Sequence, residues 1–253
     1  MIDVSVITAA FNSASDIERN IRSVGTQTRR PREHIIVDDG SVDDTRAIAD
    51  GLKDEFPQLR LIRQANRGAA NARNTGIDAA SSRYIAFLDS DDVWGEHKLE
   101  AQVEFMMTNS VAFSYGDYKS VDASTGLELG LHEAPQQLSY AALLRGCPIG
   151  CLTVAFDQTV LGKHHMPDVQ RGQDWGLWLA LTRGGTIARR YPGCHAYYHV
   201  SSGSLSSHKV GKAADIYRIY REQENLGPIR SFAYLASHIG AALAKRPVKK
   251  SGT

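Results

Sequence analysis

The sequence predicts an α/β fold: a doubly wound, mostly parallel sheet of Rossmann-like βαβ units with helices on both faces. Along the first 93 residues, short β-rich runs alternate with helical patterns. The β-rich runs are almost continuously apolar, which is typical of parallel strands buried on both faces. Right-handed crossovers between such strands place the intervening helices against the sheet. The 253 residues, 42% of them hydrophobic and 23% charged, allow one large globular domain with a sizeable core.

Seven elements are predicted in this first half. The four predicted strands cover residues 4–8, 34–37, 59–62 and 84–88. A capping box, Ser15-x-x-Glu18, predicts where the first helix begins. The first two helices repeat apolar residues at helical spacing: Ile17, Ile21, Val24 and then Ile48, Leu52, Phe56. A third helix, about residues 68–80, has a face of small residues that predicts close approach to a neighbouring backbone: Ala69, Ala72, Gly76 and Ala80.

The second half lacks this regular alternation. The sequence predicts a helix containing Leu99, Val103 and Met106, β-like stretches at 111–118 and 151–156, a tryptophan-rich helix at 174–182, and two later helices within 210–220 and 229–243. There is no low-complexity linker and no internal repeat. We therefore expect the second half to extend the first half's sheet within one continuous domain.

An open parallel sheet binds ligands at the carboxyl ends of its strands. The segments that directly follow three of the predicted strands are residues 9–13, 38–41 and 89–92, and their residues are mostly small or polar. They are the first place to look for chemistry.

The strongest local signal is Asp89-Ser90-Asp91-Asp92, where an apolar strand delivers three carboxylates in four positions. Carboxylates this dense repel one another unless a divalent cation shares the charge. A turn must follow the strand at once, because Asp89 and Asp91 need not point the same way in an extended segment. The alternative is an acidic loop that caps the next helix.

Asp38-Asp39-Gly40-Ser41 ends the second strand in a similar way. Asp39 could accept a hydrogen bond from a base N–H or a ribose hydroxyl, Gly40 permits a tight turn, and Ser41 or Asp43 can cap the following helix. Carboxylates after a strand are also often simple caps, so this motif alone leaves both interpretations open.

Arg73 belongs to the third helix, whose first turn can face the same edge of the sheet. Arginine can pair with phosphate or hold a carboxylate in place. The alternative is a structural salt bridge.

Asp174 lies in the first turn of the tryptophan-rich helix, between Gln173 and Trp175. A helix N-terminus stabilises a carboxylate, and Trp175 and Trp178 could form a water-poor wall beside it. A carboxylate in that setting can serve as a general base. The alternative is an ordinary helix cap.

The composition excludes several classes of protein. The net charge of +1 argues against a nucleic-acid binder. Three cysteines without CxxC spacing support neither a disulfide framework nor a zinc site, so a reducing compartment fits best. The N-terminus lacks signal-peptide character and no apolar run approaches about 20 residues, so we expect a cytoplasmic protein that does not cross a membrane.

The charge is unevenly distributed along the chain. After Glu224 the sequence has five basic residues and no acid: Arg230, Lys245, Arg246, Lys249 and Lys250. A basic tail behind an apolar helix could contact anionic lipid at the membrane periphery. A solvated chain end is the equal alternative.

Four motifs, in this order and spacing, resemble glycosyltransferase family 2, the inverting sugar transferases of GT-A fold. They cover residues 4–12, 37–45, 66–74 and 87–92. Weaker matches at 150–154, 171–175 and Ser204-x-Ser206 extend the resemblance to about residue 225. They resemble the bacterial branch that builds capsule, colanic-acid-like, O-antigen and teichuronic-acid polysaccharides.

The resemblance implies a role for each motif residue. Phe11 stacks on the nucleobase, Asp39 binds uracil, and Arg73 and Asp89 lie along the ribose and diphosphate. Asp91 is the main ligand of Mg²⁺ or Mn²⁺, with Asp89 beside it, and Asp174 is the catalytic base. Thr8 and Ser90 complete the donor site. Residues 204–209 form a flap over the diphosphate.

The resemblance also implies substrates and organisation. The donor is a nucleoside diphosphate sugar, expected to be a UDP-sugar, and the acceptor is a saccharide or lipid-linked saccharide. Residues 1–95 are the nucleotide-binding half and 96–225 the acceptor-side half of one domain, and 226–253 are a C-terminal helix and tail. Two departures are Ala9-Ala10, where Pro-Thr or Pro-Ser is usual, and His199, where relatives often carry Arg. The second leaves the diphosphate with less positive charge.

Two other interpretations remain open. Asp89-Ser-Asp-Asp-Val93 also fits the signature of haloacid dehalogenase-like phosphatases, and Gly116-Asp-x4-Asp122 imitates their distal acids, although too little chain lies between the two. A non-catalytic sugar-nucleotide or glycan-binding module would lack the metal acid or the base, and both are present. A G-x-G-x-x-G fingerprint is absent after the first strand, which excludes a dinucleotide dehydrogenase.

Overall fold

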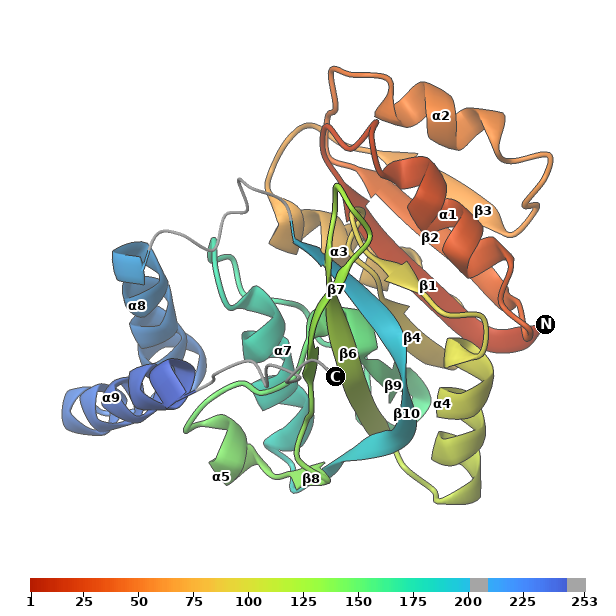
Figure 1. Cartoon of the computed structure of the whole chain (residues 1–253). Coiled ribbons are helices and arrows are strands. Elements are labelled where there is room, and N and C mark those ends of the chain that lie inside the picture. The colour runs from red at the N-terminus through yellow and green to blue at the C-terminus, as the bar shows by residue number, and fades with distance from the viewer. Residues whose placement is uncertain (201–208, 245–253) are drawn as a thin grey trace.

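One mixed sheet organises the molecule (Figure 1), a computed structural model that describes residues 1–200 and 209–244. Its strands run in the order β3-β2-β1-β4-β9-β6-β10-β5. The four predicted strands are confirmed as β1 (Ile2–Ala10), β2 (Pro31–Asp38), β3 (Leu59–Arg63) and β4 (Tyr84–Phe87). They pair in parallel, so their carboxyl ends meet at one edge, as the sequence predicts.

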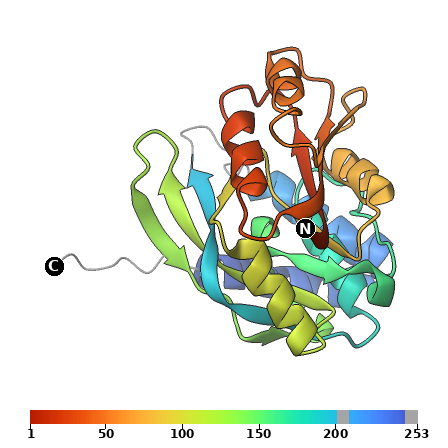
Figure 2. The ribbon, with the colours of Figure 1, turned by 90° about the vertical axis from the view of Figure 1, so that its right-hand side faces the viewer.

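Helices cover both faces of this sheet. The helices beside the first strands are α1 (Ile17–Gly25), α2 (Thr45–Gly51), α3 (Ala69–Ala79) and α4 (Lys98–Thr108). Alternate residues of β1 and β4 belong to different cores, one shared with α3 and the other with α4. In Figure 2, α1 and α4 lie on the near side of the sheet. The nearly continuous apolar strands therefore reflect burial on both faces.

The predicted capping box of α1 is wrong. The Ser15 hydroxyl donates to the Asp16 side chain at 2.6 Å instead of accepting from a helix N–H. The Ser13 carbonyl accepts from the N–H groups of Asp16 and Ile17 at 3.0 and 2.9 Å. A backbone turn therefore begins α1, and the Ser15 side chain is not its cap.

The small face of α3 approaches β1 closely, as predicted. A Cβ on Gly76 would lie 2.4 Å from Cγ2 of Ile7, far inside contact distance. Only glycine fits there, and this contact fixes where the first turn of α3 meets the sheet edge.

The second half extends the same sheet. It adds β5 (Val93–Trp94), β6 (Phe113–Asp122), β7 (Glu128–His132), β8 (Gln137–Leu138), β9 (Ala155–Asp157) and β10 (Ala188–Val200). The strand predicted at 151–156 is only half right, because residues Cys151–Thr153 form a 3₁₀ turn. The carbonyls of Leu152 and Thr153 accept from the side chains of Trp94 and Gln102, so they are not available to a strand.

The remaining helices cover the face that α3 covers. They are α5 (Tyr140–Leu143), α6 (Gln158–Leu161), α7 (Gln173–Thr182), α8 (Lys209–Arg218) with a π turn at Ile219–Gln223, and α9 (Pro228–Ala244). Trp175, Ile216 and Tyr220 join α7 and α8 in one core. None of the helices in the described ranges is long and apolar enough to cross a bilayer. The predicted flap at 204–209 falls largely outside the described residues, and the basic tail from Lys245 falls wholly outside them.

Candidate active site

Three loops meet at the carboxyl edge of the sheet and hold one another. Asp92 N–H donates to the Asp89 carbonyl at 3.0 Å, which closes the predicted turn directly after β4. The hydroxyls of Ser13 and Ser90 are 2.8 Å apart, which ties the turn to the end of β1. Asn12 N–H donates to the Ser41 hydroxyl at 3.0 Å, which ties β1 to the end of β2. The predicted ligand edge is thus a connected surface.

The acidic turn concentrates negative charge. Asp91 is exposed, and partial desolvation followed by the charge of Asp89 raises the pKa of its carboxyl. Asp92 is fully buried, and burial followed by the charges of Asp89 and Asp91 raises the pKa of its carboxyl well above the usual range. The mutual repulsion of Asp89, Asp91 and Asp92 is the part of these shifts that a bound cation would relieve.

The carboxylates of the turn are suited to bind a Mg²⁺-like ion together with the phosphate oxygens of a substrate. Within the described ranges, no three His, Cys, Asp or Glu side chains form a ready metal cage. Mg²⁺ is commonly bound through one or two carboxylates together with substrate phosphates. Asp91 presents an exposed carboxylate, and the Asp89 side chain is 30% exposed, so these two could hold the protein side of such an ion.

Helix α1 supports the backbone of the turn, which the sequence analysis missed. The Asn20 side-chain amide donates to the carbonyls of Asp89 at 2.8 Å and Asp92 at 3.1 Å. The Arg19 guanidinium donates to the Asp91 carbonyl at 3.0 Å. Since Asn20 is fully buried, the turn has little freedom to shift.

A sequence signal for Asn20 does exist. It lies three residues after Ile17 and four before Val24, within the apolar face that packs against the sheet. A buried polar side chain needs hydrogen-bond partners, so an amide on that face indicates a backbone or ligand to hold.

Thr8 lies beneath the acidic turn and does not face solvent. Its hydroxyl is 3.0 Å from Nε2 of His34 and donates to Oδ1 of Asn20 at 3.5 Å. Burial lowers the pKa of His34 to about 3, so this imidazole is neutral near pH 7. Thr8, which was expected to contact the donor, is placed to orient Asn20.

Asp39 is buried at the end of β2 and organises the loop before α3. Its carboxylate accepts from the Gln64 amide at 2.7 Å, from Arg67 N–H at 3.0 Å and from Gly68 N–H at 2.8 Å. Phe11, at the end of β1, is 48% exposed. An exposed aromatic ring and a carboxylate on adjacent strands are the two contacts expected for a nucleobase.

Arg73 carries the positive charge at the centre of the site. Its guanidinium pairs with Asp89 at 2.5 Å, and its side chain is only 11% exposed. Burial alone would lower the pKa of Arg73, but the carboxylate of Asp89 outweighs it and Asp174 adds to the rise. The ion pair with Asp89 therefore ties Arg73 of α3 to the acidic turn.

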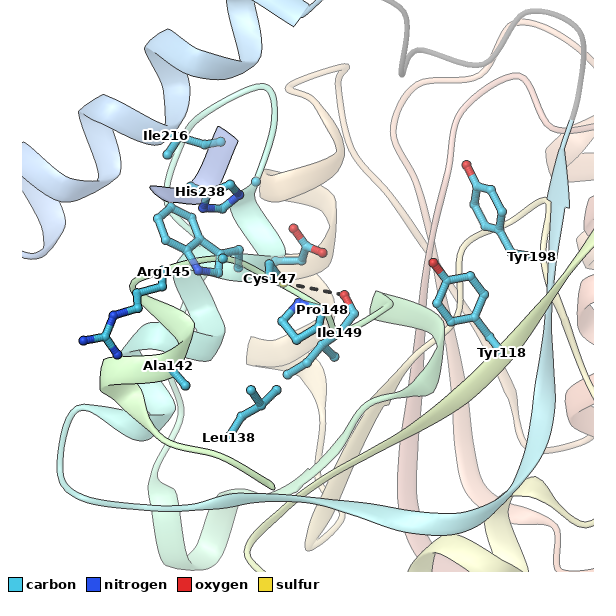
Figure 3. Close-up of a pocket in the computed structure, with 14 residues that line it drawn as sticks. Tyr118, Leu138, Ala142, Arg145, Cys147, Pro148, Ile149, Tyr198, Ile216 and His238 are labelled. Atoms are coloured by element: carbon cyan, nitrogen blue, oxygen red, sulfur yellow. Dashed lines mark hydrogen bonds between the residues drawn. The ribbon is translucent and has the colours of Figure 1, made fainter. Parts of the chain in front are cut away.

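Asp174 is in the first turn of α7 and lines a cavity of about 670 Å³ (Figure 3). Gly172 precedes the helix with φ of 75°, a left-handed conformation that glycine adopts without strain. Trp175 also lines this cavity and donates its indole N–H to the Leu143 carbonyl at 2.8 Å. Trp178 does not line it, because its ring packs on Phe87 and Phe113 in the core.

The far wall of this cavity adjoins the acidic turn. Figure 3 shows Tyr118 and Tyr198 projecting from β6 and β10 opposite Cys147 and His238. Burial raises the pKa of Tyr198, and the charges of Asp92, Asp91 and Asp89 raise it further. The cavity reaches Tyr198, next to His199, whose backbone is hydrogen-bonded to Asp92, but the acids of the turn are not among its lining residues.

The buried thiol of Cys151 lies among the same charged groups. Burial raises the pKa of its thiol well above the usual range, and the negative charges of Asp89, Asp174 and Asp92 add to the effect while Arg73 opposes it. Residues separated by more than 80 positions in the sequence are thus gathered around one point.

His199 does not supply the positive charge of the arginine that relatives often carry at this position. Its backbone N–H donates to Asp92 Oδ1 at 2.9 Å, which ties β10 to the acidic turn. Burial, and then the nearby Arg19, lower the pKa of its imidazole, so it adds no positive charge near pH 7. Arg19 and Arg73 are the guanidinium groups beside the turn in the described residues.

The acids that imitated a phosphatase motif are engaged elsewhere. Asp117 pairs with Arg190 at 3.1 Å, and Asp122 accepts from Ser124 and Thr125 in the turn after β6. Neither contacts the acidic turn. The phosphatase interpretation is therefore wrong.

The chain is similar in sequence to known proteins. A sequence model described as "Glycosyl transferase family 2" matches residues 5–154. The chain is 38% identical over 245 residues to "Putative teichuronic acid biosynthesis glycosyltransferase TuaG" of Bacillus subtilis (strain 168), covering 96% of this chain and 97% of that protein. It is 36% identical over 249 residues to "UDP-Glc:alpha-D-GlcNAc-diphosphoundecaprenol beta-1,3-glucosyltransferase WfgD" of Escherichia coli, covering 96% and 94%.

Solved structures share the fold at low sequence identity. The crystal structure of S. aureus TarS 1-349 in complex with UDP-GlcNAc superimposes with a TM-score of 0.74 at 19% identity, covering 94% of this chain and 72% of that one. Mannosyltransferase PcManGT from Pyrobaculum calidifontis, in complex with GDP-Man and Mn2+, gives a TM-score of 0.67 at 18% identity, covering 96% and 76%. The fold is therefore GT-A, as the sequence resemblance implies.

Proposed function

The chain belongs to glycosyltransferase family 2 and is a glycosyltransferase, and from its site we propose that it transfers one sugar from a UDP-sugar, with inversion, to a lipid-linked saccharide. The product would be a growing cell-surface polysaccharide. The relatives TuaG and WfgD, by their names, act in teichuronic acid biosynthesis and on a diphosphoundecaprenol-linked sugar. Their near full-length similarity supports the same class of reaction here.

One observation carries this proposal. Arg73 and Cys151 both feel the charges of Asp89 and of Asp174. Geometry supports the same proximity, because Asp174 and Tyr198 line one cavity and His199, next to Tyr198, donates its backbone N–H to Asp92 at 2.9 Å. We infer that the acids of the leaving-group side and the base Asp174 act on one bound donor and acceptor.

The donor end binds through the three sheet-edge loops. We assign the base to the exposed ring of Phe11 and the carboxylate of Asp39, and the ribose and diphosphate to Arg73 and the Asp89–Ser90 backbone. Asp91 and Asp89 would hold Mg²⁺ or Mn²⁺, which would supply positive charge to the departing diphosphate. The Mn2+ in the PcManGT complex supports a divalent ion in this fold.

Asp174 acts on the acceptor. Its place in the first turn of α7 favours the ionised carboxylate, as does the nearby charge of Arg73. An ionised Asp174 takes the proton from the acceptor hydroxyl while that oxygen forms a bond to the anomeric carbon. The bond from this carbon to the diphosphate oxygen breaks, and UDP leaves with the electron pair. One displacement from the opposite face inverts the configuration.

The cavity suits a saccharide acceptor. Tyr118, Trp175 and Tyr198 line it with aromatic surface, and His238 and Arg145 add polar groups. Sugars present flat apolar faces and hydroxyl rims, so they need this mixture. We assign this cavity to the acceptor because Asp174 lines it.

A donor screen tests the reaction class. UDP-, GDP- and dTDP-sugars are offered with a GlcNAc-diphospholipid acceptor, with and without Mn²⁺, and product is measured by mass. We expect transfer from a UDP-sugar and loss of transfer with EDTA. UDP binding without turnover on any acceptor would instead support the non-catalytic binding module.

The Asp174→Asn variant tests the base. Removing a general base typically lowers the rate by about 10²- to 10⁴-fold, and calorimetric UDP affinity should not change. Asp44→Asn is the matched control, because Asp44 is exposed at the start of α2 and makes no cap hydrogen bond. Near-normal turnover of Asp174→Asn would refute the assigned role.

A further inference from the structure

The outer face of α9 is a stripe of apolar side chains. Ile229 is 85% exposed, Phe232 is 69% exposed and Ile239 is 42% exposed. Ala233 and Ala236 lie between them at helical spacing and are also exposed. Exposed aliphatic and aromatic residues that share one helix face indicate a surface that is covered in use.

The opposite face of α9 already holds the helix on the protein. Tyr234 and Leu235 pack against the main core, and the His238 ring meets Trp175 edge-on at 4.9 Å between centroids. The Ser231 hydroxyl donates to the Gly227 carbonyl at 3.0 Å. The outer stripe is therefore not needed to dock α9, and Figure 1 shows α9 at the edge of the molecule, away from the sheet.

The chain from α9 onward carries charge of one sign. The sequence after Glu224 has five basic residues and no acid, and of these the structure describes Arg230, which is exposed on α9. Glu224 does not offset this charge, because its side chain is fully buried and pairs with Arg183 at 2.8 Å. Apolar side chains on a helix with basic residues beside them are typical of helices that lie in the interface of an anionic bilayer.

We propose that the outer face of α9 docks this enzyme on an anionic membrane surface, with Ile229, Phe232 and Ile239 entering the headgroup region. A second copy of the chain is a poorer occupant. It would bring the like-charged Arg230 side chains of two α9 helices toward one another, and one helix stripe is small beside the roughly 800 Å² per partner that stable interfaces bury.

Docking through α9 also places the catalytic cavity near the bilayer. His238, on the inner face of the same helix, lines the cavity with Asp174. This consequence rests on the proposed lipid-linked acceptor, whereas the docking itself does not. The membrane would then present the acceptor's diphosphate end beside the cavity.

Liposome co-sedimentation of the full chain tests the docking without any turnover. We expect binding to vesicles of phosphatidylglycerol and phosphatidylcholine (30:70), and much weaker binding to phosphatidylcholine alone. The double variant Ile229→Ser/Phe232→Ser should bind the anionic vesicles about 10-fold more weakly or worse. Val42→Ser/Val160→Ser is the matched control, because these side chains are 90% and 64% exposed away from α9.

Several results would overturn the docking proposal. They are equal binding to both vesicle types, unchanged binding by the α9 variant, or equal loss in the control variant. A dimer in sedimentation equilibrium that the α9 variant dissociates would assign the stripe to a second copy instead. UDP affinity of the α9 variant should equal that of the wild type, so a failed donor screen and a failed docking test are told apart.

Discussion

The buried amide of Asn20 offers the sharpest test of how the acidic turn is built. Replacing it with leucine keeps the side-chain size and removes both N–H donors. The carbonyls of Asp89 and Asp92, which accept from it at 2.8 and 3.1 Å, would then lack these partners. The turn could shift, and the carboxylates it carries would shift with it.

The expected magnitude follows from these two hydrogen bonds. A typical hydrogen bond contributes about 1 kcal/mol net, and a buried polar group left unpaired costs about 1–3 kcal/mol. The Asp89 carbonyl keeps the Asp92 N–H as a partner, whereas the Asp92 carbonyl loses the only side-chain donor described for it, so the free energy of unfolding should fall by about 2–4 kcal/mol. Groups that orient metal ligands typically change metal affinity by about 10- to 100-fold, and we expect that loss here.

The assay separates metal binding from folding. Mn²⁺ affinity in the presence of UDP is measured by calorimetry, and the free energy of unfolding by urea denaturation. Asn109→Leu is the control, because the Asn109 amide likewise donates to a backbone carbonyl, that of Phe105 in α4 at 2.9 Å, and not to the turn. If Asn20→Leu does not fold, Asn20→Ser keeps a smaller polar group and takes its place.

Unchanged Mn²⁺ affinity in Asn20→Leu or Asn20→Ser would refute the reasoning, even if stability falls. It would mean that the turn keeps its shape without help from α1. A loss of affinity equal to that of the Asn109 control would refute it as well, since the effect would then not be local.

Three further predictions follow from single contacts. Gly76→Ala should lower the free energy of unfolding by about 1–3 kcal/mol, because its Cβ would lie 2.4 Å from Ile7, and Ile7→Ala in the same chain should cost less than the sum of both changes. His34, with its pKa lowered to about 3, stays neutral when folded while the unfolded chain binds a proton below about pH 6.5. Urea unfolding should therefore show stability falling as pH drops from 6.5, by up to about 1.4 kcal/mol per unit, and falling less in His34→Gln. Arg73→Lys should lower kcat/KM by at least about 10-fold with little change in melting temperature, because lysine lacks the planar fork that reaches Asp89, and equal kcat/KM would contradict its place beside the donor.

The parallel half of the fold and its ligand edge could be predicted from the sequence because their signals are local. Continuous apolar runs at β1 to β4 require burial on both faces, and parallel strands must end at one edge. The small face of α3 likewise required a close neighbour, which is Ile7. The acidic turn after β4 was predicted because Asp89 and Asp91 need not point the same way in an extended strand, so a turn has to bring their carboxylates together.

The second half was harder, because its conformation depends on distant partners. The strand predicted at 151–156 became partly a 3₁₀ turn, since Trp94 and Gln102 take its carbonyls. No local pattern records that competition.

In the first half, the predicted Ser15 capping box was wrong, because the Ser13 carbonyl begins α1 with a backbone turn.

The sequence by itself determined the α/β class, the family, and the position of the acidic turn after β4, because the signals for each are local in the chain. Only the tertiary structure decided that Asn20 and Arg19 hold the backbone of the acidic turn, and that Thr8 is buried beneath it. It also decided that Asp174 lines a cavity with Tyr198, whose neighbour His199 is hydrogen-bonded through its backbone to Asp92 of the acidic turn. Those relations join segments far apart in the chain, and only the packing of α1, α3 and α7 on one sheet brings them together.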